Sequence, residues 1–116
     1  MEGFEKRPWG SFKTLAKTEG YHVKELTVEP QQRLSLQSHK FREEHWYVVS
    51  GAAEVTIDEG TYLMMAGNSI DIPLGAIHRI QNNDANSQLI IIEIQTGTYF
   101  GEDDIIRYED DYNRIK

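Results

Sequence analysis

A chain of 116 residues, of which 39% are hydrophobic and 27% charged, has the size and balance of one globular domain. It contains no cysteine, which excludes disulfides and thiolate metal sites. The formal net charge of −7 argues against a nucleic-acid backbone as a partner, and no apolar run reaches the length of a membrane span. We therefore expect a cytoplasmic protein that binds neither nucleic acid nor a membrane.

The positive charges are concentrated in the first part of the chain. Eight of the twelve Lys and Arg residues lie between Lys6 and Arg42, whereas the segment from Glu102 onward carries six acidic residues against three basic ones. An anionic ligand would therefore meet a local basic cluster rather than the overall field of the protein.

Short segments of alternating polarity, separated by turn residues, predict a chain of β-strands. The expected strands are Tyr21 to Val28, Arg33 to His39, Glu44 to Val49, Ala52 to Asp58, Thr61 to Met65, Ser69 to Ile72, Ile77 to Gln81 and Leu89 to Gln95. Many short strands at close spacing predict an all-β sandwich or barrel, of which the jelly roll is one solution. We expect one domain over residues 1–116, with an N-terminal arm (1–20), a barrel core (21–97) and an acidic C-terminal segment (98–116) that holds one short helix.

Leu89 to Gln95 is the most β-branched run of the chain and predicts a central strand. Isoleucines occupy positions 90, 91, 92 and 94, which favours burial on both faces. Glu93 interrupts this apolar run, and burial would raise the pKa of its carboxyl. The alternative is an ordinary strand residue that faces outward.

The segment Gln37 to Gly51 carries the densest set of side chains that can bind a metal or an anion. Gln37 and His39 are two residues apart, so on a strand they leave the same face. Glu44 follows a short polar stretch that could form a turn, and a hairpin would bring its carboxylate opposite the Gln-x-His pair. This geometry suits a metal site on a β-scaffold.

Two spaced patterns resemble the signatures of the cupin superfamily. Gly67-x5-Pro73-x-Gly75-x2-His78-x3-Asn82 matches the second signature at every spaced position, and Glu44-x6-Gly51 matches the second half of the first. A His-x-His pair normally precedes that glutamate, and Gln37-x-His39 departs from it at one position. The resemblance implies a cupin jelly-roll β-barrel.

The departure itself resembles one cupin family. Gln-x-His-x2-Arg-x-Glu-His-Trp, from Gln37 to Trp46, is similar to the cupin domain of type II mannose-6-phosphate isomerases. Arg7-Pro8-Trp9-Gly10, Ile92 to Gly97 and Gly101 to Arg107 extend this resemblance almost from end to end. These domains are halves of bifunctional enzymes that are also mannose-1-phosphate guanylyltransferases. Because 116 residues leave no room for a nucleotidyltransferase domain, guanylyltransferase activity is not expected.

The resemblance implies a metal-dependent isomerase that interconverts mannose 6-phosphate and fructose 6-phosphate. It also implies one divalent transition metal held by a four-residue set: Gln37, His39, Glu44 and His78. Two imidazoles, a carboxylate and an amide oxygen suit Zn²⁺ first, with Mn²⁺, Fe²⁺, Co²⁺ or Ni²⁺ as alternatives. The competing interpretation is that His39 and His78 are surface or structural histidines.

An aldose–ketose isomerase moves a proton between C2 and C1 of an open-chain sugar, and it needs a base for this step. Glu93 is the first candidate, with His45 and Glu43 as rivals. Strand alternation places His45 on the face opposite Glu44, which counts against it.

A sugar phosphate also needs cations. Arg42 can offer a bidentate fork both to the phosphate and to the reacting centre. Arg107 occupies a position similar to the family, and Lys24 shares the parity of the apolar Leu26 and Val28. The competing interpretation for each is a solvated surface charge.

Two other functions remain open from the sequence. A binding module would keep the fold and the metal, and would hold a sugar phosphate or nucleotide sugar for a separate nucleotidyltransferase. An oxygenase on the same scaffold is disfavoured by Gln37, because oxygen activation usually needs a more electron-rich ligand set. A homodimer is expected from either function, because the tryptophan-bearing arm suits an exchange of edge strands.

Overall fold

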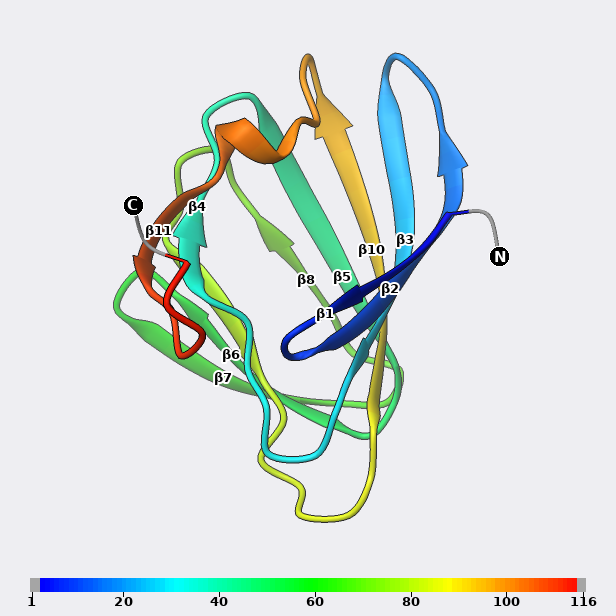
Figure 1. The fold of residues 1–116 in the computed structure, drawn as a ribbon, viewed down its shortest axis with the longest axis vertical. Helices are drawn as coiled ribbons and strands as arrows, with labels where there is room; N and C mark the ends of the chain where they lie inside the picture. Colours follow the sequence, from blue (N-terminus) through cyan, green and yellow to red (C-terminus); the bar gives the residue numbers. More distant parts are fainter. Residues whose placement is uncertain (1–2, 115–116) are drawn as a thin grey trace.

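The computed structural model describes residues 3–114, apart from the side chain of Glu102, as two antiparallel sheets that face each other (Figure 1). Within that range the helical content is a single 3-10 turn, η1 (Glu102–Asp104), so the predicted all-β fold is confirmed. The same residues include no helix with the length and hydropathy that a bilayer span requires. Residues 1, 2, 115 and 116, which the predicted domain includes, lie outside the described part.

Eleven strands make up the two sheets of the described chain. They are β1 (Phe4–Arg7), β2 (Gly10–Lys17), β3 (Tyr21–Val28), β4 (Leu36–Ser38), β5 (Arg42–Ser50), β6 (Ala52–Ile57), β7 (Gly60–Met65), β8 (Ser69–Ile72), β9 (His78–Gln81), β10 (Leu89–Gly97) and β11 (Ile106–Glu109). The first sheet has the order β1-β2-β3-β10-β5-β8, and the second has the order β11-β4-β9-β6-β7.

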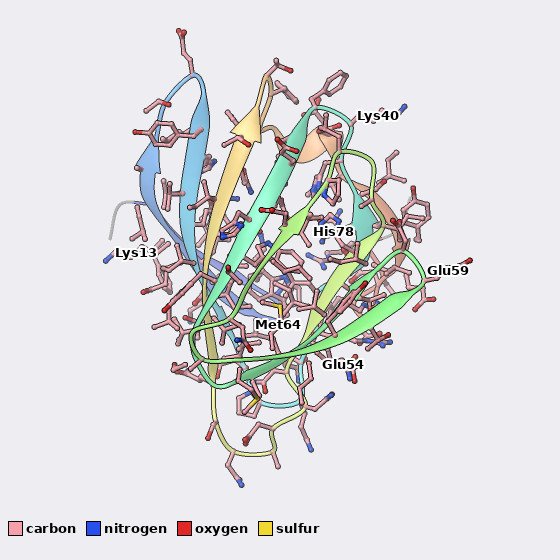
Figure 2. The ribbon with its side chains drawn as sticks, turned by 180° about the vertical axis from the view of Figure 1, so that it is seen from behind. Lys13, Lys40, Glu54, Glu59, Met64 and His78 are labelled. Atoms are coloured by element: carbon pink, nitrogen blue, oxygen red, sulfur yellow. The ribbon has the colours of Figure 1, made fainter. Side chains whose placement is uncertain are left out.

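The hydrophobic core lies between the two sheets, because the strands bury one face and expose the other. In β3, for example, every second side chain from His22 to Val28 is buried. The core residues are Trp9, Phe12, Leu26, Val28, Trp46, Val48, Ala53, Val55, Met64, Ile72, Ala76, Ile80, Leu89 and Ile91. In the view of Figure 2, His78 lies above Met64 and below Lys40.

Within the segment predicted as an arm, β1 and β2 form a hairpin that extends the first sheet. β1 pairs with β2, and β2 pairs with β3 from Gly10 to Lys17. Gly10 has a φ of 154°, and a Cβ there would lie 1.9 Å from the carbonyl oxygen of Thr27. Only glycine therefore allows this approach, which places Trp9 and Phe12 in the core.

β10 is central in the first sheet, as predicted, between β3 and β5. The expectation that it is buried on both faces is wrong. Its inner residues, including Glu93 and Gln95, are buried, but Ile90 and Ile92 are only half-buried and Ile94 is 37% exposed. The inner face of β10 packs inside the barrel, whereas its outer isoleucines lie on the surface of the sheet.

The predicted strand Arg33 to His39 is much shorter in the structure. Regular pairing covers only Leu36–Ser38, and Arg33 forms an isolated bridge with Gln81. The predicted hairpin between this strand and Glu44 is also wrong. β4 pairs with β9 and β11 in the second sheet, whereas β5 pairs with β10 and β8 in the first. Glu44 therefore approaches the Gln-x-His segment across the interior of the barrel.

The acidic C-terminal segment follows β4 along the second sheet (Figure 1). Its expected short helix is the 3-10 turn, and the strand β11 follows. Ion pairs join it to the barrel: Arg33 Nε lies 2.8 Å from Asp111 Oδ2, and Arg79 Nη1 lies 3.1 Å from Glu109 Oε1. The same segment covers Arg79 of β9, whose buried guanidinium donates to the carbonyl oxygen of Leu34 and to the carboxylate of Glu109.

Candidate metal centre

A cavity between the sheets collects most of the predicted site residues. Gln37, Glu44, His78, Glu93 and Arg42 line it, together with Lys24 and Arg107. The second sheet supplies Gln37, His78 and Arg107, and the first sheet supplies Arg42, Glu44, Glu93 and Lys24. Strand alternation explains this gathering, since each of these side chains lies on the inward face of its strand.

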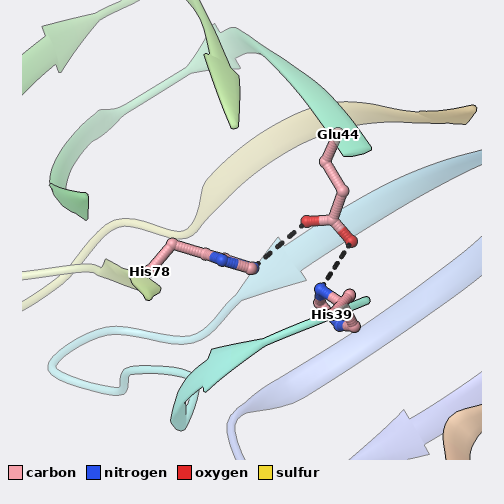
Figure 3. Close-up of side chains that lie close together, drawn as sticks. All are labelled: His39, Glu44 and His78. Atoms are coloured by element: carbon pink, nitrogen blue, oxygen red, sulfur yellow. Dashed lines mark ion pairs between the residues drawn. The ribbon is translucent and has the colours of Figure 1, made fainter. Parts of the chain in front are cut away.

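His39, Glu44 and His78 converge in this region, and their candidate ligand atoms all lie within 4.8 Å of one another (Figure 3). His78 Nε2 lies 3.4 Å from Glu44 Oε1, and His39 Nδ1 lies 3.8 Å from Glu44 Oε2. All three residues are buried. Two imidazoles and a carboxylate at this spacing fit a divalent transition metal, with room for further ligands.

His78 is held by a backbone contact of the kind found behind metal ligands. Its Nδ1 lies 2.9 Å from the carbonyl oxygen of Ala76, which can only accept, so this nitrogen carries a proton. The ring is thereby fixed with Nε2 toward Glu44. The residues after Gly75, whose φ is 77°, thus orient the imidazole.

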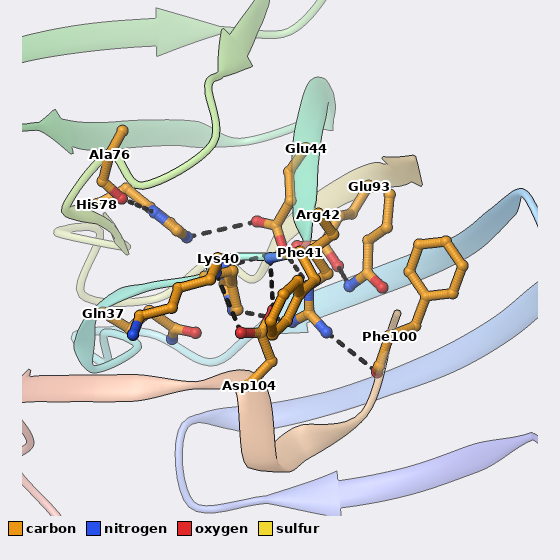
Figure 4. Close-up of polar contacts among 12 residues, drawn as sticks. Gln37, Lys40, Phe41, Arg42, Glu44, Ala76, His78, Glu93, Phe100 and Asp104 are labelled. Atoms are coloured by element: carbon orange, nitrogen blue, oxygen red, sulfur yellow. Dashed lines mark hydrogen bonds and ion pairs between the residues drawn. The ribbon is translucent and has the colours of Figure 1, made fainter. Parts of the chain in front are cut away.

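Gln37, the fourth predicted ligand, lies directly opposite His78 in the pairing of β4 with β9. Its side-chain nitrogen donates to Ser35 Oγ at 3.0 Å. The amide nitrogen is therefore turned toward Ser35, and the residue lines the cavity beside the three candidate ligands (Figure 4).

The charges of these three residues depend on one another. Burial alone would raise the pKa of Glu44, but His78, His39 and Arg42 together hold it well below its ordinary value. Burial disfavours the charged form of His78, yet the hydrogen bond and the charge of Glu44 outweigh it and raise its pKa. Burial dominates at His39 and lowers its pKa to about 4. The site therefore contains an ionised carboxylate suited to a cation.

Arg42 is directed at the converging residues. Its Nε donates to Glu44 Oε2 at 3.3 Å, its Nη2 lies 2.9 Å from His39 Nε2, and its Nη1 donates to the carbonyl oxygen of Phe100 at 3.1 Å (Figure 4). The guanidinium is thus bonded on three sides in a buried position. Its role as a phosphate fork, predicted from the sequence, would require it to leave some of these contacts.

Glu93 lies on the inward face of β10, where Lys24 and Trp46 are its neighbours on the two adjacent strands. Its Oε2 accepts a hydrogen bond from Trp46 Nε1 at 3.0 Å, and its Oε1 accepts one from Gln95 Nε2 at 2.6 Å. Burial, followed by the charge of Glu44, raises the pKa of Glu93 to about 7. Such a carboxyl can both accept and release a proton near neutral pH.

Lys24 is 9% exposed, and its Nζ lies 4.1 Å from the centre of the Phe12 ring. Within residues 3–114 this ammonium makes no direct hydrogen bond or ion pair, and the carboxyl of Glu93 on the neighbouring strand is a charge that it influences. A buried cation without a direct hydrogen-bonded anion is costly, and an anionic ligand would remove that cost. Arg107, paired with Gln37 across β11 and β4, lines the same cavity.

The structure does not bring His45 to this cavity. Its ring lies on the outer face of β5, where Nδ1 is 2.6 Å from Asp71 Oδ1, as the alternation of the strand predicts. Sequence reasoning missed Gln95, which shares the inward parity of Glu93 and could have been found by counting two residues along the strand. It also gave no role to Arg7 and Arg114, which line the cavity from the two ends of the chain. Arg7 opens the Arg7-Pro8-Trp9-Gly10 motif, which could have pointed to it, whereas Arg114 lies in no motif.

The fold defined by these two sheets is that of the cupins. A cupin domain of Schizosaccharomyces pombe Cnp3 superposes with a TM-score of 0.71 at 17% identity, over 75% of this chain and 64% of that one. KdgF from Halomonas gives a TM-score of 0.75 at 16% identity, over 83% and 88%. The predicted cupin jelly roll is therefore confirmed.

Residues 3–110 match the family described as "Mannose-6-phosphate isomerase C-terminal", and the chain belongs to this family. Its relatives include the alginate biosynthesis protein AlgA of Pseudomonas aeruginosa, 49% identical over 93% of this chain. The mannose-1-phosphate guanylyltransferase ManC of Salmonella typhimurium is 45% identical over 94%. The chain spans only 22% of the length of either relative, so the match concerns a single domain of longer proteins.

Proposed function

We propose that the protein is a metal-dependent isomerase that interconverts mannose 6-phosphate and fructose 6-phosphate. The observation that carries this proposal is the position of Glu93. It is a buried carboxyl with a pKa raised to about 7. It lies two residues before Gln95 on the same face of β10, and Gln95 is paired with Glu44 on β5. A proton acceptor beside a group of candidate metal ligands is what an aldose–ketose isomerase needs.

His39, Glu44 and His78, with Gln37 beside them, would hold one divalent metal, Zn²⁺ first, which supplies polarisation of the sugar carbonyl when bound. Glu93 takes the proton from C2 of the open-chain aldose, the electron pair of that bond forms the double bond between C1 and C2, and the π pair of the C1 carbonyl moves onto O1. The hydroxyl proton of O2 then passes to O1, the C2 carbonyl forms, and the electron pair of the C1–C2 double bond takes the proton back from Glu93 at C1. Trp46 and Gln95 orient the carboxylate for both transfers.

The phosphate of the sugar lies at the opposite side of the cavity, near Lys24, with Arg107 contributing. Adjacent strands are about 4.8 Å apart, so Lys24 on β3 is roughly 10 Å from β5, which carries Glu44. An extended six-carbon sugar with its phosphate spans a comparable distance. Glu93 on the intervening strand β10 would then lie beside the carbon chain, toward C1 and C2.

The isomerase proposal is tested by measuring aldose–ketose interconversion on a panel of sugar phosphates, with metal analysis of the same sample. Exchange of the C2 proton with deuterated solvent should accompany turnover. Glu93→Gln should keep metal and sugar-phosphate binding and lower both rates by about 10²–10⁴. Normal turnover in this variant would remove Glu93 from the mechanism.

The second candidate is a binding module, and the relative named as a mannose-1-phosphate guanylyltransferase supports it. In that case the chain would hold a sugar phosphate or nucleotide sugar for a separate nucleotidyltransferase. The protein would be loaded with each candidate metal in turn. Binding of the sugar phosphate without proton exchange or isomerisation in every case would support the binding module and exclude the isomerase. The homodimer and the cytoplasmic location remain predictions for either function.

A further inference from the structure

The guanidinium of Arg42 contacts two of the three converging metal-ligand candidates at the same time. Its Nη2 is 2.9 Å from His39 Nε2, and its Nε is 3.3 Å from Glu44 Oε2 (Figure 4). Both contacts are buried, so water does not screen them. A positive group therefore already interacts with the lone pairs that a metal cation would use.

The direction of these hydrogen bonds fixes the state of the His39 ring. A guanidinium has only donors, so His39 Nε2 must accept and cannot carry a proton. The ring proton is then on Nδ1, which faces Glu44 Oε2 at 3.8 Å. In this arrangement one ring nitrogen is occupied by Arg42 and the other by its proton. Neither offers a lone pair to a metal.

His78 differs from His39 in this respect. Its Nδ1 donates to the backbone oxygen of Ala76, the usual arrangement behind a ligating histidine, and leaves Nε2 to the centre. A partner that orients a ligating histidine must accept a proton, and Arg42 cannot. Arg42 therefore does not orient His39 as a ligand in this arrangement, but occupies it.

We propose that Arg42 competes with the metal ion for His39 and Glu44, and that its guanidinium leaves these atoms when the metal binds. The inference rests on the proposed metal centre and concerns how readily that centre is loaded. Release of the guanidinium also frees donors inside the cavity that Lys24 and Arg107 line.

The sign of the effect on metal affinity distinguishes competition from orientation. Zn²⁺ affinity is measured by competition with a chelating dye for the parent and for Arg42→Lys, which keeps the charge and loses the fork. Competition predicts that Arg42→Lys binds Zn²⁺ about tenfold more tightly, as expected from the loss of one charge-assisted hydrogen bond. Orientation predicts binding weakened by about 10–100-fold.

Arg114→Lys is the matched control. Arg114 also lines the cavity, but its guanidinium binds Asp110 and not the metal ligands, so its Zn²⁺ affinity should stay within about threefold of the parent. An equal gain in Zn²⁺ affinity in both lysine variants would overturn the proposal. It would mean that the loss of any guanidinium in the cavity raises the affinity, whether or not it contacts the candidate ligands.

A measurement on the parent protein needs no variant to fold. The Nε–H resonance of Arg42 and the ring-nitrogen resonances of His39 are followed by NMR during a Zn²⁺ titration. Competition predicts that both change together as the metal binds. Saturation with Zn²⁺ while the Arg42 signal is unchanged would overturn it. If neither the parent nor Arg42→Lys binds Zn²⁺, the metal centre itself is refuted, and the competition with it.

Discussion

Glu93 makes the stability of the metal-free protein depend on pH in a way that a single substitution isolates. The carboxyl is buried between Lys24 and Trp46, and burial raises its pKa from an ordinary 4.5 to about 7. The folded protein therefore holds this proton more tightly than the unfolded chain. Its contribution to stability is present below about pH 4.5 and is lost as the pH rises through about 7.

The size of the loss follows from the two pKa values. Their difference corresponds to about 3 kcal/mol of unfolding free energy between pH 4.5 and pH 8. Glu93→Gln has no carboxyl proton to lose, so its unfolding free energy should not fall in this way. The difference in unfolding free energy between variant and parent should therefore shift by about 3 kcal/mol in favour of the variant between pH 4.5 and pH 8. Urea unfolding in the presence of a chelator, at a series of pH values, measures this.

The difference between the two proteins is the quantity to compare, because His22 and His39 titrate in the same window. Burial lowers the pKa of each to about 4, so each adds stability as the pH rises from about 4 to 6.5, and this gain is common to parent and variant. Glu43→Gln removes an exposed carboxylate from the same sheet, on β5, and serves as the matched control. Parallel curves for the parent and Glu93→Gln would refute the assignment of a raised pKa to Glu93.

Three further predictions concern the site and its supports. His78→Ala should lose most of the bound metal because it removes one of three converging ligands, and elemental analysis showing unchanged content in both His78→Ala and His39→Ala would eliminate the centre. Lys24→Met should weaken use of a sugar phosphate by about 1.5–3 kcal/mol in kcat/KM, with metal content retained, and unchanged kinetics would place the phosphate elsewhere. The carboxylate of Asp104 accepts hydrogen bonds from the backbone N–H groups of Lys40 and Phe41 at 3.1 and 3.0 Å. Asp104→Asn should therefore lower the unfolding free energy by about 1–3 kcal/mol in urea and speed hydrogen exchange at these two amides, and unaltered exchange there would contradict this.

Local alternation carried most of what the sequence predicted correctly. It placed Lys24 on the inward face of its strand and His45 on an outward face, because the two-residue period of a strand does not depend on distant partners. Glu93 was singled out differently, as a carboxylate within an apolar run whose burial was expected on both faces. The spacing of the two cupin-like signatures likewise anticipated that His39, Glu44 and His78 would lie together. The direction of a strand side chain depends on one strand at a time, whereas the grouping of His39, Glu44 and His78 was implied by the resemblance to a known family.

Features that depend on long-range pairing were not accessible in the same way. Glu44 follows His39 by only five residues, and a hairpin was the simplest prediction. However, β4, which ends just before His39, and β5, which carries Glu44, belong to opposite sheets. Which strands pair is decided by contacts far apart in sequence, such as that of β4 with β11. The burial of Arg79 and the target of Arg42 were missed for the same reason, since each long side chain meets a partner that sequence position does not reveal.

The unbroken register around β10 also limits how this protein can change in length during evolution. Pairing of β10 with β5 is continuous from Ile91 to Gly97, and its pairing with β3 is continuous from Leu89 to Thr96. A single-residue insertion or deletion inside these stretches would turn every later side chain to the other face, so Glu93 and its neighbours would leave the cavity. Descendants of this sequence should therefore accept insertions in turns such as residues 18–20 and 58–59, while these three strands keep their length and vary only by substitution.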